Sequence, residues 1–218
     1  MARIVFDLDG TLIDSAPDIH GVANAVLGAE GCDPITLADT RRFIGNGASV
    51  FIDQMRAIRD IPDADHARLL DMFMARYEDA VHLTVLYEGV REVLDHLVAQ
   101  GHLLGLCTNK PISPTRRVLA HMGLDPYFKI VLGGDSLPKR KPDPAPLRAC
   151  FDALGDGPKI YVGDSEVDAQ TAQAAQVPFM LFTRGYRKSP VEALPHAVRF
   201  DMWSVVPELV TQVLHLST

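Results

Sequence analysis

The chain of 218 residues contains only three cysteines, Cys32, Cys107 and Cys150, and no Cys-x-x-Cys spacing. An odd number of cysteines without that spacing argues against a disulfide framework and against a thiolate zinc site. No apolar run approaches the roughly 18 residues that a membrane-spanning helix needs, and no signal-peptide pattern follows Met1. We therefore expect a cytoplasmic protein with no membrane partner.

Basic clusters are also scarce. The 21 Lys and Arg residues are outnumbered by 28 Asp and Glu residues, which gives a formal net charge of -7. The longest basic run, Lys139 to Lys141, lies in a proline-rich loop and does not provide the electropositive surface that binds nucleic acids. We therefore expect no nucleic-acid partner. The hydrophobic content of 47% is sufficient for a substantial core, in one large domain or in a large and a small one.

Five short apolar runs predict strands that are covered on both faces, because their apolar residues are nearly continuous rather than alternating. These runs are residues 3–6, 103–108, 129–132, 159–162 and 179–183. Helical periodicity appears between them at residues 90–98, 116–121 and 144–154, and a glycine follows each of these segments. The alternation predicts an α/β fold with a doubly wound parallel sheet.

Residues 16–83 interrupt this alternation, since they contain four helix-like segments and no convincing strand. We interpret them as a helical insert after the first strand, which forms a second domain or lid. The core would then consist of residues 1–15 and 84–218. Two linkers, near residues 14–17 and 82–89, would join the two parts.

Polar residues follow the predicted strands: Asp7 and Asp9 after the first, Thr108 after the second and Asp164 after the fourth. In open α/β sheets, ligands collect at the carboxyl ends of the strands. Two carboxylates about 5 Å apart repel each other by roughly 3 kcal/mol at an effective dielectric constant near 20. A hard divalent cation such as Mg2+ would offset that repulsion. The sequence therefore predicts an Mg2+ site at this edge.

The same residue types suit phosphoryl transfer. A carboxylate beside a metal ion can attack phosphorus and form an aspartyl-phosphate. A lysine from the loop at residues 139–141 and a threonine hydroxyl would hold the transferring phosphoryl group. A second carboxylate would move the proton.

Four motifs in this order resemble those of the haloacid dehalogenase (HAD) superfamily. They are DLDGT at residues 7–11, Thr108 after a hydrophobic strand, KPDP from Lys141, and GDSEVD at residues 163–168. The resemblance covers the whole chain, because the helical insert falls where that superfamily has its C1 cap. It implies a Rossmann-like core in which the first strand is central.

The resemblance also implies roles for individual residues. Asp7 would be the nucleophile and a metal ligand. Asp9 would be the general acid and base, and would bind the metal through its backbone carbonyl. Asp164 would complete the Mg2+ site. Asp168 would be either a supporting ligand or a carboxylate that contacts the metal ligands and not the metal itself.

Substrate phosphate would be bound by Thr108 and by its neighbour Asn109. Lys141 would contact both the nucleophile and the phosphate. We prefer it to Lys139 because it directly precedes the Pro-Asp-Pro sequence.

The cap sequence RRFIGNGASVFI, residues 41–52, resembles the Arg-x-x-x-Gly-x-Gly signature of phosphoglycolate phosphatases. The glycines around Asn46 would let backbone N–H groups approach a small anionic substrate. We therefore expect Gly45 and Asn46 to bind substrate. Arg41 is the expected partner of a substrate carboxylate.

The presence of Asp9 argues against a haloalkanoate dehalogenase, since enzymes of that group lack an acid at the corresponding position. We expect a Mg2+-dependent phosphomonoesterase of a small phosphorylated metabolite, with phosphoglycolate as the favoured substrate. A β-phosphoglucomutase-type phosphosugar mutase and a non-catalytic phosphate-binding protein remain the alternatives. A monomer and a homodimer are both open.

Overall fold

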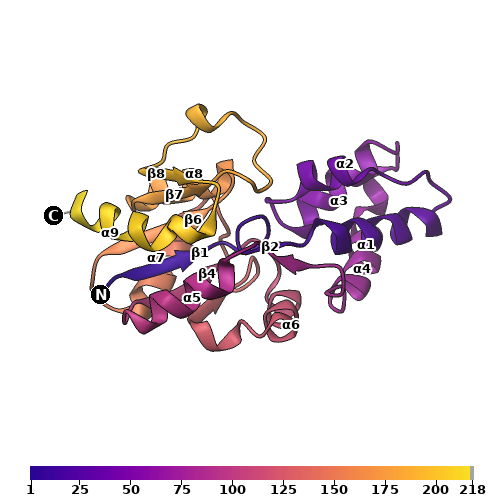
Figure 1. Ribbon diagram of the computed structural model, residues 1–218. Coiled ribbons are helices and arrows are strands. Elements are labelled where there is room, and N and C mark those ends of the chain that lie inside the picture. The colour runs from indigo at the N-terminus through magenta and orange to yellow at the C-terminus, as the bar shows by residue number, and fades with distance from the viewer. Residues whose placement is uncertain (217–218) are drawn as a thin grey trace.

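The computed structural model describes residues 1–216, and its centre is a six-stranded, fully parallel sheet with strand order β5-β4-β1-β6-β7-β8 (Figure 1). The strands are β1 (Arg3–Phe6), β4 (Leu103–Cys107), β5 (Phe128–Leu132), β6 (Lys159–Gly163), β7 (Phe179–Phe182) and β8 (Val198–Phe200). The predicted α/β class is confirmed. The five predicted strands are present with ends that differ by at most one residue, whereas β8 was not predicted.

Helices cover both faces of the sheet, as the nearly continuous apolar strands require. Ile4 and Phe6 belong to one hydrophobic cluster and Val5 to the other, because successive side chains of a strand point to opposite faces. The first cluster includes residues of α5 (Val90–Ala99), α6 (Ile112–Met122) and α9 (Val206–Leu216), and the second those of α7 (Ala145–Leu154) and α8 (Glu166–Ala175). The core is therefore a three-layer sandwich.

Four helices form a separate body beside the carboxyl ends of the strands (Figure 1). They are α1 (Ala16–Ala29), α2 (Leu37–Phe43), α3 (Ala48–Ala57) and α4 (His66–Tyr77). Their apolar faces form a cluster of their own, in which the ring of Phe51 lies 5.8 Å from that of Phe43 and 5.4 Å from that of Phe73. The domain boundaries at residues 15 and 84 remain a prediction, which this separate cluster supports.

The two connections between the bodies lie side by side. They pair as a short antiparallel ribbon of β2 (Ile13–Asp14) and β3 (Val85–Leu86), at the two linkers expected near residues 14–17 and 82–89. One carboxylate oxygen of Asp18 accepts hydrogen bonds from the backbone N–H groups of Leu83 and Thr84, at 2.9 and 2.7 Å, and from the Thr84 hydroxyl at 2.7 Å. Asp18 therefore ties the start of the cap to the point where the chain returns to the core.

Candidate active site

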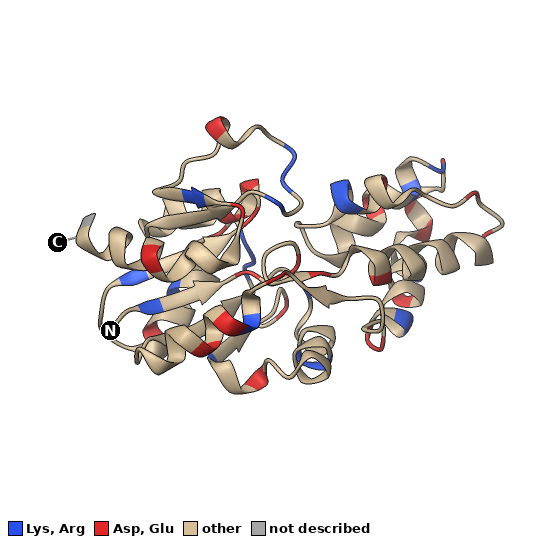
Figure 2. Ribbon diagram, viewed as in Figure 1, with Lys and Arg blue, Asp and Glu red and all other residues tan. Residues whose placement is uncertain are grey.

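The strand order brings together the residues that follow three different strands. β1 lies between β4 and β6, with Phe6 in register with Leu106 and with Val162. Asp7 therefore lies between Thr108, which follows β4, and Asp164, which follows β6. Figure 2 shows acidic segments of the chain in the loops where the sheet meets the cap.

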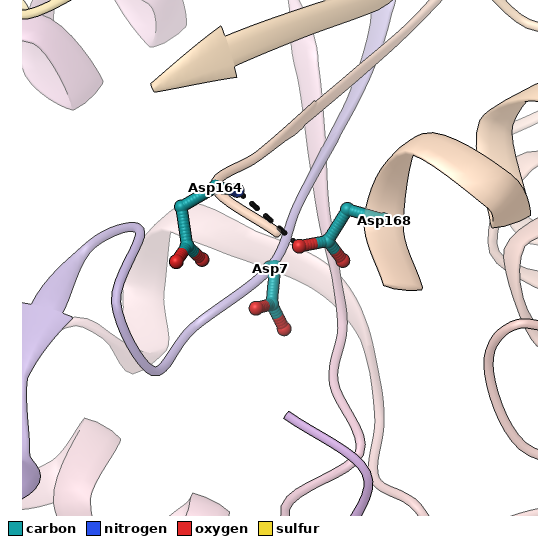
Figure 3. A group of neighbouring side chains, drawn as sticks. All are labelled: Asp7, Asp164 and Asp168. Carbon is teal, nitrogen blue, oxygen red and sulfur yellow. Dashed lines mark hydrogen bonds between the residues drawn. The ribbon is translucent and has the colours of Figure 1, made fainter. Parts of the chain in front are cut away.

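Three buried carboxylates form the acidic centre of the site (Figure 3). One oxygen each of Asp7, Asp164 and Asp168 lies within 4.8 Å of the other two. Burial raises the pKa of Asp7 from 3.8 to about 7 against the opposing effect of Lys141. Burial, together with the charges of Asp168 and Asp7, raises the pKa of Asp164 well above its ordinary value. The centre thus has more negative charge than its surroundings stabilise.

Asp164 is held from two sides. The Thr11 hydroxyl donates to one of its oxygens at 2.8 Å, and the backbone N–H of Tyr186 donates to the other at 2.6 Å. Gly10 makes this approach possible: its φ is +88°, and a Cβ at this position would lie 2.6 Å from an Asp164 oxygen. The turn after β1 therefore requires glycine both for its backbone conformation and for space.

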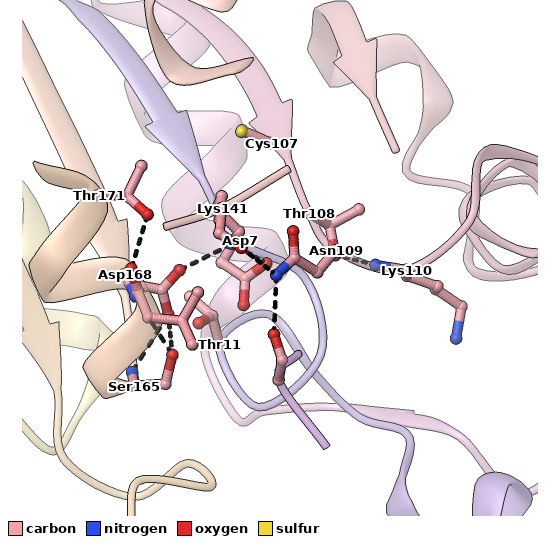
Figure 4. Close-up of polar contacts among 12 residues, drawn as sticks. Asp7, Thr11, Cys107, Thr108, Asn109, Lys110, Lys141, Ser165, Asp168 and Thr171 are labelled. Atoms are coloured by element: carbon pink, nitrogen blue, oxygen red, sulfur yellow. Dashed lines mark hydrogen bonds and ion pairs between the residues drawn. The ribbon is translucent and has the colours of Figure 1, made fainter. Parts of the chain in front are cut away.

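Lys141 is buried between two of the carboxylates (Figure 4). Its Nζ donates to Asp7 Oδ1 at 2.8 Å, to Asp168 Oδ1 at 2.7 Å and to the Tyr161 hydroxyl at 2.9 Å. Burial lowers its pKa, but the charges of Asp168 and Asp7 outweigh this and raise the pKa overall. Lys139, the alternative, is exposed and pairs with Asp143 at 3.2 Å.

Asp168 orients its neighbours and has little capacity left for a metal ion. Its Oδ1 accepts from Lys141 and from Tyr161, each at 2.7 Å. Its Oδ2 accepts from the Ser165 hydroxyl at 2.6 Å, as part of the capping box that begins α8. Burial raises its pKa, but the Lys141 charge and these hydrogen bonds lower it overall, so Asp168 is ionised.

The residues after β4 connect the core with the cap. Thr108 is buried and faces a cavity that Asp7 also lines. The Asn109 side-chain amide donates to the backbone carbonyl of Lys141 and to that of Gly45 in the cap, both at 2.9 Å. Its Oδ1 is buried and has no hydrogen-bond partner among the residues that the structure describes. Asn109 therefore bridges the two bodies and presents one unpaired acceptor.

The side chain of Asp9 points away from the carboxylate cluster. Its Oδ1 accepts from the Ser15 hydroxyl at 2.6 Å and lies 3.4 Å from the Lys110 Nζ. The HAD resemblance assigns only the backbone carbonyl of Asp9 to the metal, and these contacts of its carboxylate are compatible with that assignment. The carboxylate also lines the cavity, where it can exchange a proton with a ligand.

The cavity between core and cap has a volume of about 40 Å³. The core contributes its polar lining, which includes Asp7, Asp9 and Thr108, and the cap contributes the apolar side chains of Phe51 and Phe73. The cavity is partly open to solvent and is not enclosed.

The cap residues expected to bind substrate are placed differently from one another. Gly45 lines the cavity, and neither Arg41 nor Asn46 is among the described residues that do so. Arg41 forms an ion pair with Asp14 of the β2 linker at 3.0 Å, and its side chain is 46% exposed. Asp14 in turn accepts from the Tyr186 hydroxyl at 2.6 Å. Arg41 is thus engaged at the connection between the bodies.

Sequence reasoning missed the hydroxyl of Tyr161, the buried Lys110 and its partner Tyr77 in α4. Tyr161 lies within β6 and reads as an ordinary core residue. Lys110 was open to detection, because it directly follows Thr108 and Asn109 at a strand end. Tyr77 gave no such signal.

Comparison with known proteins identifies the family. A family model described as haloacid dehalogenase-like hydrolase matches residues 4–182. The chain belongs to this family. A phosphoglycolate phosphatase of Cereibacter sphaeroides, which is 51% identical over 217 residues, matches 98% of this chain and 100% of its own length. A phosphoglycolate phosphatase of Rhodobacter capsulatus is 45% identical over 212 residues, which are 95% of each protein.

The fold is also similar to that of a solved structure. The crystal structure of a predicted phosphoglycolate phosphatase from Haemophilus somnus 129pt superimposes with a TM-score of 0.89 at 30% identity, over 95% of this chain and 97% of that one. The expected HAD-type fold and phosphatase class are therefore confirmed. Within residues 1–216, no helix has the length and apolar character needed to cross a membrane.

Proposed function

We propose that the protein is a Mg2+-dependent phosphomonoesterase of a small phosphorylated metabolite, with phosphoglycolate favoured, and that it works through an aspartyl-phosphate on Asp7. The contact of 2.8 Å between the buried ammonium of Lys141 and Asp7, which lines the cavity, carries this proposal. A carboxylate held beside a cation and next to a cavity is suited to attack an anionic phosphorus centre. The names of the relatives above support phosphoglycolate as substrate.

The acidic centre fits Mg2+. It offers hard carboxylate oxygens, which Mg2+ prefers, and burial raises the pKa of Asp7 and of Asp164, which supports a dication there because it would compensate their charge. We assign Asp7 and Asp164 as ligands through their carboxylates and Asp9 through its backbone carbonyl. When bound, Mg2+ would neutralise the phosphoryl oxygens and the ligand carboxylates.

In the first half of the reaction, a carboxylate oxygen of Asp7 attacks phosphorus and the bond from phosphorus to the ester oxygen breaks. Lys141 keeps Asp7 oriented, and the Thr108 hydroxyl binds a phosphoryl oxygen. The leaving oxygen takes a proton from the Asp9 carboxyl group, which Ser15 and Lys110 hold in place.

In the second half, Asp9 is a carboxylate and acts as base. It takes a proton from a water molecule, whose oxygen attacks phosphorus while the bond to Asp7 breaks. Phosphate leaves, and both aspartates return to their initial states. Closure of the cap limits the water that reaches the first step, and opening admits substrate and releases product.

Phosphate release from a panel of phosphate esters, with Mg2+ and with EDTA, tests the proposal. We expect hydrolysis of 2-phosphoglycolate with Mg2+ and a loss of at least about 100-fold with EDTA, because two buried carboxylates would then repel the substrate. Isomerisation of β-glucose 1-phosphate without net phosphate release would instead identify the mutase. Binding of phosphate esters without any turnover would identify a non-catalytic protein.

Binding of Mg2+ should depend on pH through Asp7. Because burial raises the pKa of Asp7 to about 7, this group is protonated below that pH and must release its proton when Mg2+ binds. We therefore expect affinity to rise with pH up to the pKa and then to level off. Titration calorimetry in buffers of different ionisation enthalpy measures the released protons, and pH-independent affinity between pH 5 and 7 would contradict the assignment of Asp7 as a ligand.

A further inference from the structure

Lys110 is a second buried lysine in the site, and its role differs from that of Lys141. It is 6% exposed and lines the cavity. Its Nζ donates to the Tyr77 hydroxyl at 2.5 Å and lies 4.2 Å from the centre of that ring. Its one carboxylate partner, Asp9, is 3.4 Å away, which is a long contact for an ion pair.

Lys110 is the only lysine or arginine among the described residues that line the cavity. Lys141 lies behind Asp7 and is surrounded by Asp7, Asp168 and Tyr161. Arg41, which the sequence suggested as the partner of a substrate carboxylate, pairs with Asp14 outside the cavity. Among the described residues that line the cavity, Lys110 is therefore the cation that a second anionic group of a bound ligand can contact.

The pair of Lys110 and Tyr77 also has unused hydrogen-bond donors. An ammonium group has three N–H donors, and only two contacts are formed here, to Tyr77 and to Asp9. Tyr77 accepts from Lys110, and its own hydroxyl hydrogen has no acceptor within residues 1–216. Both groups therefore have a donor available for a ligand oxygen, one from the core and one from the cap.

The surroundings strengthen such a contact. The adjacent lining is apolar and includes Ile19, Phe51 and Phe73. A hydrogen bond to a charged group is stronger in such a setting than in water, and leaving a buried cation poorly paired is costly. An anion that arrives with the substrate would compensate Lys110.

We propose that Lys110 and Tyr77 bind the carboxylate of a short phosphorylated carboxylic acid whose phosphoryl group lies at Asp7, and so make the enzyme prefer such acids to esters without a carboxylate. This inference rests on the proposed phosphatase function. Lys110, two positions after Thr108, would thus take the role of carboxylate partner that the sequence suggested for Arg41. Because Tyr77 ends α4, the substrate would contact the core and the cap at the same time.

The test is the ratio of kcat/KM for 2-phosphoglycolate to that for ethyl phosphate, which has a methyl group in place of the carboxylate. In Lys110→Met, which keeps a long side chain without charge, we expect this ratio to fall on the order of 100-fold. Tyr77→Phe keeps the ring and removes one donor, and the ratio should fall roughly 10-fold. Lys129→Met, at an exposed lysine of β5, is the matched control.

The outcomes distinguish a failure of the carboxylate-binding proposal from a failure of the phosphatase function. Equal loss on both esters in Lys110→Met would overturn the proposal, because Lys110 would then act through Asp9 alone. An unchanged ratio in Tyr77→Phe would overturn the part assigned to the cap, and this variant gives the answer even where Lys110→Met does not fold. If the wild-type protein hydrolyses neither ester with Mg2+, the phosphatase function itself fails.

Discussion

In the Asp7→Asn variant, we expect phosphate release from 2-phosphoglycolate to fall by at least about 10⁴-fold, because an amide cannot form the acyl-phosphate bond. The amide has nearly the same shape, and its oxygen can still accept from Lys141, so the site should remain assembled. Single-turnover phosphate release with saturating Mg2+ measures the loss. Asp33→Asn, at an exposed loop residue of the cap, is the matched control.

The same variant has a stability signature. The folded-state pKa of Asp7 is raised from 3.8 to about 7, so the stability that its protonated form contributes is fully present below pH 3.8 and is lost as pH rises through about 7. Asparagine has no such dependence. In EDTA at a pH above 7, Asp7→Asn should therefore melt no lower than the wild type. Activity close to that of the wild type, or unfolding of the variant, would remove Asp7 from its assigned role.

Replacement of Lys141 should have the second-largest effect. We expect Lys141→Met to lower kcat/KM by roughly 10³-fold, because the group that orients Asp7 and faces the phosphoryl oxygens is lost. The same change leaves Asp7 and Asp168 buried without their cation, which should lower the free energy of unfolding by about 3–5 kcal/mol. Steady-state kinetics and urea unfolding measure the two effects.

Two further variants make the Lys141 result specific. Lys139→Met removes a charge from the same loop, but this side chain is 70% exposed and paired with Asp143, so less than about 0.5 kcal/mol should be lost. Adding Asp168→Asn to Lys141→Met removes one of the uncompensated charges and should recover part of the lost stability. If Lys139→Met instead reproduced the loss of activity, the roles of the two lysines would have to be exchanged.

The sheet was predictable because its strands are buried on both faces. Runs such as Ile4 to Phe6 have no polar residue until they end, and the ends coincide with the catalytic motifs. β8 was not predicted because its three residues include the exposed Arg199, which leaves too little apolar pattern to indicate a strand. The β2–β3 ribbon was not predicted because its two strands have only two residues each and are separated in the sequence by the 70 residues from 15 to 84.

The part of the candidate site whose residues follow strands was predictable from the sequence. The part that is contributed by helices of the cap was not. The positions of Asp7 and Asp164 follow from strand order alone. The contact between Lys110 and Tyr77 depends on how the cap packs on the core, and no local pattern specifies that packing. The orientation of Arg41 is another example: its place at the end of α2 directs it to Asp14, although the signature around it suggested a substrate contact.

The paired connections at β2 and β3 have an evolutionary consequence. The chain leaves the core at Asp14 and re-enters it at Val85, and these two residues are direct partners. Recombination at these two points could exchange the gene segment that encodes the cap. The distance between the two ends of the core that the new segment must join would stay the same. The catalytic residues of the core and the cap's own contribution to ligand binding, such as Tyr77, can therefore diversify separately, because they are encoded in different segments of the gene.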